Sequence, residues 1–403
     1  MRMFFSCLRH GALLSTFLAL FSLQGFSQST ATLRGNVTDS SGAAISGAQV
    51  VARNQGTGIE RTTKTDETGN YDLPALPIGS YQVEARAQGM QATTLNGVVL
   101  QVSQIVVQNI QMGVAKGSEI VNVTADLPVI DSGSMTVGQV INSTTVQEIP
   151  LNGRHFVDLG LLLPGSVTPP ANGFLTAPLR GQGSFGIVTA GNREDTVNFM
   201  INGINLNDMA NGQVTFQPSI NTVQEFKADN STYSAENGRN SGAIVHIATR
   251  SGSNTWHGEG FDFLRNEAMD ARNFFNPSGL PQSTFKRNNF GGNIGGPIWK
   301  NRTFFFFSYE GLRQRQGLSL SAGVLSPAER AAITDPSSQK LAALIPEANV
   351  INPPTTPGGP SIYQFVSSAT APVNIDQGTM DVTHEFNQAD HLQIGRASCR
   401  ERV

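Results

Sequence analysis

A chain of 403 residues is long enough for two or three domains of the usual size of about 150 residues. Charged residues make up only 14% of it and 42 residues are Gly, where about 25% charged residues are usual, so we expect a folded, weakly charged and turn-rich chain. The 27 Lys and Arg residues do not outnumber the 30 Asp and Glu residues, and the net charge of -3 therefore argues against nucleic-acid binding.

Residues 1–27 have the features of a secretory signal peptide. Arg2 and Arg9 precede an apolar stretch from Ala12 to Phe21, and small residues suit cleavage before Gln28. A transmembrane anchor is the alternative, but this stretch is shorter than the roughly 20 residues that a spanning helix needs. We therefore expect export across the inner membrane.

The composition changes abruptly over residues 394–403, which carry three Arg residues and Cys399. We interpret this tail as the translation of a sequencing artefact, and a native basic tail is the alternative. The other cysteine, Cys7, lies in the expected signal peptide. Without the tail the mature chain would have no cysteine, which excludes disulfides, thiol catalysis and thiolate metal sites.

Short strand patterns separated by turn residues recur over residues 31–113. The clearest strand runs from Tyr81 to Ala87, where apolar and polar residues alternate, so we expect an antiparallel β-sandwich. The segments Gly35–Asp39, Thr65–Tyr71 and Leu76–Tyr81 together resemble the carboxypeptidase regulatory-like domain. That resemblance implies a transthyretin-like sandwich without catalytic residues, sometimes grouped with carbohydrate-binding folds.

Residues 114–140 lack a core-forming pattern and are expected to be a linker. Within them lies a β-prone segment that resembles the TonB box, which implies the TonB energy-coupling protein as a partner. An exposed extended segment can add as a strand to a partner's sheet. The residues of this segment are Glu119, Ile120, Val121, Asn122, Val123, Thr124 and Ala125.

Residues 141–252 carry an ordered set of Gly- and Asn-rich motifs that resembles the plug domain of TonB-dependent receptors, particularly the Oar-like group with a regulatory-like sandwich in front. The resemblance implies an α+β plug. It departs from the common pattern at Asn202, where an Asp is frequent. The motif residues that we single out are Arg180, Gly181, Asn202, Gly203, Gly242 and Thr249.

Residues 253–393 change to aromatic-rich strand patterns, with short turns alternating with long loops. Asn289 and Asn293 are expected on the face opposite Phe290 and Ile294, and strands of this kind are typical of a β-barrel in outer-membrane lipid. A soluble sandwich with an aromatic core is the alternative. Ser326 predicts the start of a short helix in the longest loop. A barrel of about 22 strands needs more residues than follow position 252, so we expect an incomplete barrel.

The six His residues form no H-E-x-x-H pattern, and the chain has no Gly-x-Ser-x-Gly or P-loop motif, so we expect no catalytic residue, metal or cofactor. The sequence predicts a mostly β protein: a periplasmic sandwich, a plug and the first strands of a barrel in the cell outer membrane. We predict that the chain is the N-terminal part of a TonB-dependent transporter, and that this transporter carries out energised uptake of a large or scarce extracellular substrate. The alternative is a secreted or surface-attached binding module, such as an adhesin that binds carbohydrate.

Overall fold

The computed structural model describes twelve stretches of the chain. These are residues 30–115, 121–124, 136–151, 153–167, 186–193, 196–208, 214–233, 237–238, 241–271, 284–353, 361–387 and 390–402, with the backbone alone described at 121–124, 318–321, 366–371 and 401–402. The expected signal peptide and the motif residues Arg180 and Gly181 lie outside these ranges. The chain divides into two compact units, residues 1–258, 293–308 and 379–397 in one and residues 259–292, 309–378 and 398–403 in the other.

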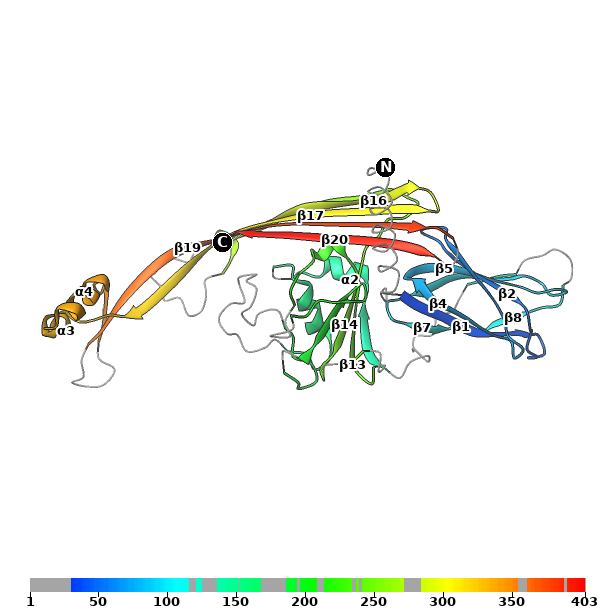
Figure 1. Ribbon diagram of the computed structural model, residues 1–403, viewed down its shortest axis with the longest axis horizontal. Coiled ribbons are helices and arrows are strands. Elements are labelled where there is room, and N and C mark those ends of the chain that lie inside the picture. The colour runs from blue at the N-terminus through cyan, green and yellow to red at the C-terminus, as the bar shows by residue number, and fades with distance from the viewer. Residues whose placement is uncertain are drawn as a thin grey trace, which may run out of the picture. The chain divides into compact units, whose positions relative to one another are not determined.

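The N-terminal strands form two sheets, as the turn-rich alternation predicts (Figure 1). In one sheet the order is β4-β1-β7, with β8 also paired to β1, and in the other it is β3-β2-β5-β6-β9. The strands are β1 (Thr30–Asp39), β2 (Gln49–Asn54), β3 (Glu60–Lys64), β4 (Asn70–Pro77), β5 (Gly79–Arg86), β6 (Thr93–Leu100), β7 (Ile105–Val107), β8 (Ile110–Met112) and β9 (Val121–Thr124).

The core of this sandwich comes from alternate residues of the strands. Tyr81, Val83 and Ala85 of β5 are buried, which confirms the expected alternation. Their partners in the core include Leu33 of β1 and Val50 of β2, both fully buried. Because the two sheets share one apolar layer, the region from 31 to 113 folds as a sandwich around its own core.

The plug region is a five-stranded sheet of order β10-β13-β14-β11-β12 with short helices. Strands β11 and β14 are parallel, whereas β13 runs antiparallel to both β10 and β14. One face of the sheet packs against a 3-10 helix through Phe156, Phe199 and Phe226, which are almost completely buried. The elements are β10 (Val137–Ile141), α2 (Ser143–Glu148), η1 (Phe156–Leu162), β11 (Asn198–Ile201), β12 (Ile204–Asn205), η3 (Ile220–Thr222), β13 (Val223–Ser231) and β14 (Ile244–Thr249).

Two parts of the expected linker differ from the prediction. Val121–Thr124 forms β9 at the edge of the sandwich, and Val137–Ile141 forms β10 of the plug sheet, so the plug begins before residue 141. The sequence gives no signal for β10 because it is an edge strand in which only Ile141 is buried. Edge strands without a buried face lack the alternation on which strand prediction depends.

The C-terminal strands form one open sheet of order β15-β16-β17-β19-β18, with β20 also paired to β19, and within the described ranges it does not close into a barrel (Figure 1). Two strands, β17 and β19, are more than twice as long as ordinary strands. The elements are β15 (His257–Asn266), η4 (Glu267–Met269), β16 (Phe285–Trp299), β17 (Thr303–Gly323), α3 (Pro327–Ala332), α4 (Pro336–Leu344), β18 (Val350–Asn352), β19 (Ile362–Glu385) and β20 (His391–Arg402).

On β16 and over part of β17, covered polar residues alternate with exposed apolar ones. Asn289 and Asn293 of β16 are buried, while Ile294 of the same strand is 45% exposed, as the alternation predicts. On β17, Glu310 is buried and Phe307 is 44% exposed. The covered side of β17 also holds Phe304 and Phe306 near the start of the strand, and the polar covered residues lie beyond them. Covered polar residues opposite exposed apolar ones are the reverse of a soluble sandwich and typical of a β-barrel strand that faces lipid on its outside.

The loop between β17 and β19 contains the helix predicted at Ser326. The Ser326 side chain accepts from the Glu329 N–H and the Glu329 carboxylate accepts from the Ser326 N–H, which completes a capping box. Helices α3 and α4 lie at the end of the long β17–β19 pair (Figure 1). Near the C-terminus, β20 extends through residues 394–402. The backbone therefore stays in an extended strand conformation where the composition changes.

Candidate coupling segment and plug domain

The middle of the candidate TonB box is an edge strand. Val121 to Thr124 pairs in parallel with β6, with Val121 opposite Thr93 and Thr124 opposite Asn96. Glu119, Ile120 and Ala125 lie outside the described residues. A segment that already pairs by its backbone can pair in the same way with a partner's sheet, since strand addition depends on main-chain hydrogen bonds.

Two of the plug-motif residues meet through a reciprocal pair of hydrogen bonds. The Asn202 amide donates to Thr249 Oγ1 at 2.7 Å and accepts from the Thr249 backbone N–H at 3.0 Å. Asn202 and Gly203 form the tight turn between β11 and β12, with φ of 46° and 80°. Both residues take the left-handed conformation that Asn and Gly tolerate best, and so the turn explains these two motif positions.

Gly242 lies at the opposite end of β14 from Thr249. Its N–H donates to the Thr196 carbonyl at 3.1 Å, and a Cβ at this position would approach that carbonyl oxygen to 2.8 Å. A side chain would therefore separate the start of β14 from the segment before β11. The structure thus gives Asn202, Gly203, Gly242 and Thr249 roles in holding the plug sheet together.

Sequence reasoning missed a row of charged residues on the face of the plug sheet opposite its apolar core. Glu225, Lys227 and Asp229 alternate along β13, His246 lies beside them on β14, and each is at most 8% exposed. Lys227 Nζ is 3.4 Å from Asp229 Oδ1, and Asp229 Oδ2 is 3.7 Å from His246 Nε2. The signal was available, because charged and apolar residues alternate with a period of two over residues 225–229.

Burial dominates the ionisation of this row. Burial, together with the smaller effect of the Lys227 positive charge, lowers the pKa of His246 to about 4, in spite of the nearby Asp229 carboxylate. Burial also raises the pKa of Glu225, while the hydrogen bond from the Val102 N–H acts in the opposite direction. His246 is therefore neutral at pH 7.

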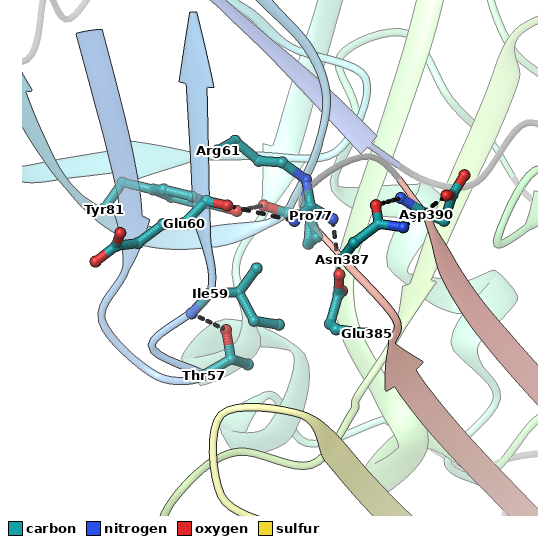
Figure 2. Close-up of polar contacts among 9 residues, drawn as sticks. All are labelled: Thr57, Ile59, Glu60, Arg61, Pro77, Tyr81, Glu385, Asn387 and Asp390. Atoms are coloured by element: carbon teal, nitrogen blue, oxygen red, sulfur yellow. Dashed lines mark hydrogen bonds and ion pairs between the residues drawn. The ribbon is translucent and has the colours of Figure 1, made fainter. Parts of the chain in front are cut away.

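A second polar cluster joins two strands that are far apart in the sequence (Figure 2). Arg61 of β3 forms an ion pair with Glu385 at the end of β19, with Nη2 2.8 Å from Oε2 and both side chains at most 13% exposed. Close by, the Tyr81 hydroxyl donates to the Pro77 carbonyl at 2.7 Å, and burial raises the pKa of Tyr81 to about 12. Arg61 and Glu385 are 324 residues apart, so no local pattern could have predicted their contact.

No cluster of metal-ligating side chains occurs among the residues whose positions are described. Nor does any helix in those ranges have the length and apolar character needed to cross a bilayer.

Two family models match the chain in the regions where the fold and the motifs lead us to expect them. Residues 32–113 match the carboxypeptidase regulatory-like domain, and residues 248–401 match the outer membrane beta barrel domain. These matches assign similarity to a carboxypeptidase regulatory-like domain to the sandwich, and similarity to an outer membrane beta barrel domain to the C-terminal strands.

The chain is also similar to a curated transporter, the "TonB-dependent transporter Oar" of Myxococcus xanthus. The two are 25% identical over 307 residues, which is 72% of this chain and 27% of the transporter. The chain thus spans about a quarter of the length of that relative. These findings support the family of outer-membrane TonB-dependent transporters.

Two solved structures are among the similar proteins. The outer membrane transporter YddB from Escherichia coli is 12% identical, covers 62% of this chain and 31% of its own, and gives a TM-score of 0.39. A putative carbohydrate binding protein from Bacteroides uniformis is 18% identical, covers 21% of this chain and 41% of its own, and gives a TM-score of 0.19.

Proposed function

We propose that the chain takes part in energised uptake of a large or scarce substrate across the outer membrane. In this proposal residues 1–27 direct export, the 31–113 sandwich lies in the periplasm, and TonB binds residues 119–125 and pulls on the plug that follows. The substrate binds on the extracellular side. The similarity to a protein named as a TonB-dependent transporter supports a role in uptake.

The observation that carries the proposal is the polarity of the β15–β20 sheet. The covered side of β16 and β17 holds Asn289, Asn293 and Glu310 next to Phe304 and Phe306, whereas the exposed side carries Ile294 and Phe307. A sheet of this kind is stable only where its exposed face contacts lipid, because in water that face would be a large solvent-exposed apolar surface. A lipid-facing wall behind a plug is the arrangement that a gated transporter needs.

Binding of TonB tests the coupling segment directly. The purified chain is titrated with the periplasmic domain of TonB, and Val123→Pro is compared with Asn122→Ala. Strand addition uses the backbone N–H, which proline lacks, so we expect Val123→Pro to abolish binding and Asn122→Ala to retain it. Failure of the unaltered chain to bind, or equal binding by both variants, would reject residues 119–125 as the coupling segment.

Dependence on energy separates uptake from adhesion. Cells that carry the protein are given a candidate carbohydrate or peptide before and after the proton-motive force is dissipated. A transporter continues to bind the substrate at the surface but stops taking it up. An adhesin, the alternative function, shows the same binding in both conditions and no uptake in either.

A further inference from the structure

A turn of the sandwich is held by the charged row of the plug sheet. The Val102 N–H donates to Glu225 Oε2 at 2.8 Å, and Lys227 Nζ donates to the Ser103 carbonyl at 2.9 Å. Glu225 and Lys227 are two positions apart and share one face of β13. Glu225 therefore accepts from a backbone N–H of the turn, and Lys227 donates to a backbone carbonyl of the same turn.

The turn has the geometry of a docking element. It is closed by a hydrogen bond from the Gln104 N–H to the Gln101 carbonyl at 3.2 Å, and Ser103 has a φ of 52°. The Val102 side chain is fully buried, yet it belongs to neither the sandwich core nor the plug core. Turn tips normally lie in water, so a buried apolar residue at this tip indicates a surface that fits against another part of the chain.

The contact is directional because it joins side chains to backbone. A carboxylate can only accept a hydrogen bond and an ammonium group can only donate one, so position 225 must carry an acceptor and position 227 a donor. Asp229, 3.4 Å from Lys227, balances the Lys227 charge from within the plug. Hydrogen bonds to charged groups are stronger than neutral ones, particularly where water is excluded.

The same strand also anchors the first strand of the plug. Along the edge of β13, β10 pairs antiparallel over five residues, from Val137 opposite Ser231 to Ile141 opposite Phe226. The chain between the sandwich and β10 is therefore attached to β13 at both of its ends. Residues 121–124 within it also pair with β6, so drawing this segment away from both domains requires one or more of these pairings to open.

We propose that Val102, Ser103, Glu225 and Lys227 form a latch that docks the sandwich on the plug and closes the coupling linker into a loop. The sandwich is then a part of the gate and not a freely tethered domain. This goes beyond the proposed function, because the docking holds whether or not residues 119–125 bind TonB.

Exchanging the two charges tests the latch. Glu225→Lys combined with Lys227→Glu keeps the net charge, although it also places a carboxylate at position 227 next to Asp229. It breaks the latch, because the Val102 N–H then faces an ammonium group and the Ser103 carbonyl faces a carboxylate. The matched control is Arg53→Glu with Glu60→Arg, an exposed pair whose Nε and Oε1 atoms are 3.7 Å apart on neighbouring strands of the sandwich.

The readout is the distance between spin labels on the sandwich and the plug. Labels are placed at the exposed positions Lys64 and Ser231 of the full chain, after replacement of Cys7 and Cys399 by Ser. We expect a single narrow distance distribution in the unaltered chain and in the control, and loss of the narrow peak after the exchange. A broad distribution in the unaltered chain, or a narrow one after the exchange, would overturn the proposal.

A second variant covers the case in which the charge exchange unfolds the plug. Val102→Asp places a carboxylate against Glu225 from the sandwich side, without changing a residue of either core. Hydrogen exchange of β5 and β14 checks that both domains remain folded. With both domains protected, an unchanged narrow peak in Val102→Asp would refute the latch.

Discussion

The link between Asn202 and Thr249 makes a graded prediction about the stability of the plug. Asn202→Ala removes both hydrogen bonds, of 2.7 and 3.0 Å, and leaves alanine at a φ of 46°. Each hydrogen bond contributes about 1 kcal/mol, and the left-handed conformation costs alanine about 1 kcal/mol more. We therefore expect a loss of about 3 kcal/mol in the free energy of opening at the end of β14.

Three companion variants separate the contributions. Asn202→Gly also loses both hydrogen bonds but tolerates the positive φ, so it should cost about 1 kcal/mol less than Asn202→Ala. Asn202→Asp keeps an acceptor for the Thr249 N–H and for the Thr249 hydroxyl, and should cost less than about 1 kcal/mol. Thr249→Val loses only the hydroxyl and should cost about 1 kcal/mol.

Native-state hydrogen exchange of residues 244–249 in the full chain measures these differences, since the exchange rate reports the free energy of local opening. The reasoning fails if Asn202→Ala and Asn202→Asp protect β14 equally, because the hydrogen bonds would then contribute nothing. It also fails if Asn202→Gly is less stable than Asn202→Ala, because backbone strain would then be absent.

Three further predictions concern other parts of the structure. The pKa of His246 is about 4 in the folded state and 6.5 in its ordinary state, so as the pH falls between those values the unfolded state binds a proton that the folded state does not. The free energy of unfolding of the plug should therefore decrease by up to about 3 kcal/mol over this range. Hydrogen exchange of β14 at several pH values measures this decrease, which should be absent in His246→Asn. Gly252→Ala places a Cβ 2.8 Å from the Phe305 backbone N, and thermal unfolding should show a destabilisation of about 1 to 3 kcal/mol, with no change if the segment can shift freely. Arg330 donates to three carbonyls at the end of α4 and beyond, at 2.6 to 2.7 Å, so Arg330→Ala should increase proteolysis of the α3–α4 loop more than Arg330→Lys does.

The strands with one buried face were predictable from the sequence. Tyr81, Val83 and Ala85 alternate with polar residues, and Asn289 and Phe290 lie on opposite faces of β16, because a period of two is a direct consequence of strand geometry. The capping box at Ser326 was predictable for a similar reason, since its two hydrogen bonds join residues only three positions apart.

The contacts between distant segments were not predictable. Arg61 and Glu385, or Val102 and Glu225, are brought together only by the tertiary fold, and no spacing in the sequence records their meeting. Strand β10 was missed because it has a single buried residue. Residues 119–125 were expected to be β-prone, but the pairing of β9 with β6 was not predictable because it depends on an edge that the sandwich provides. The alternation of charged residues along β13 can be seen in the sequence. The contacts of these residues could not be predicted, because they depend on the part of the chain that covers that face.

The relative strength of the two attachments on β13 leads to a last prediction. The latch consists of two hydrogen bonds and one buried valine, whereas β10 pairs over five residues and buries Ile141 in the plug core. Fewer contacts mean a lower free energy of local opening. We therefore expect the Val102 amide to exchange faster than the hydrogen-bonded amides of β10 in the unaltered chain. Of the two contacts on β13, force transmitted to both would then open the latch before the β10–β13 pairing. Equal exchange at the two places would contradict this order, because the sandwich and β10 would then open as one cooperative unit.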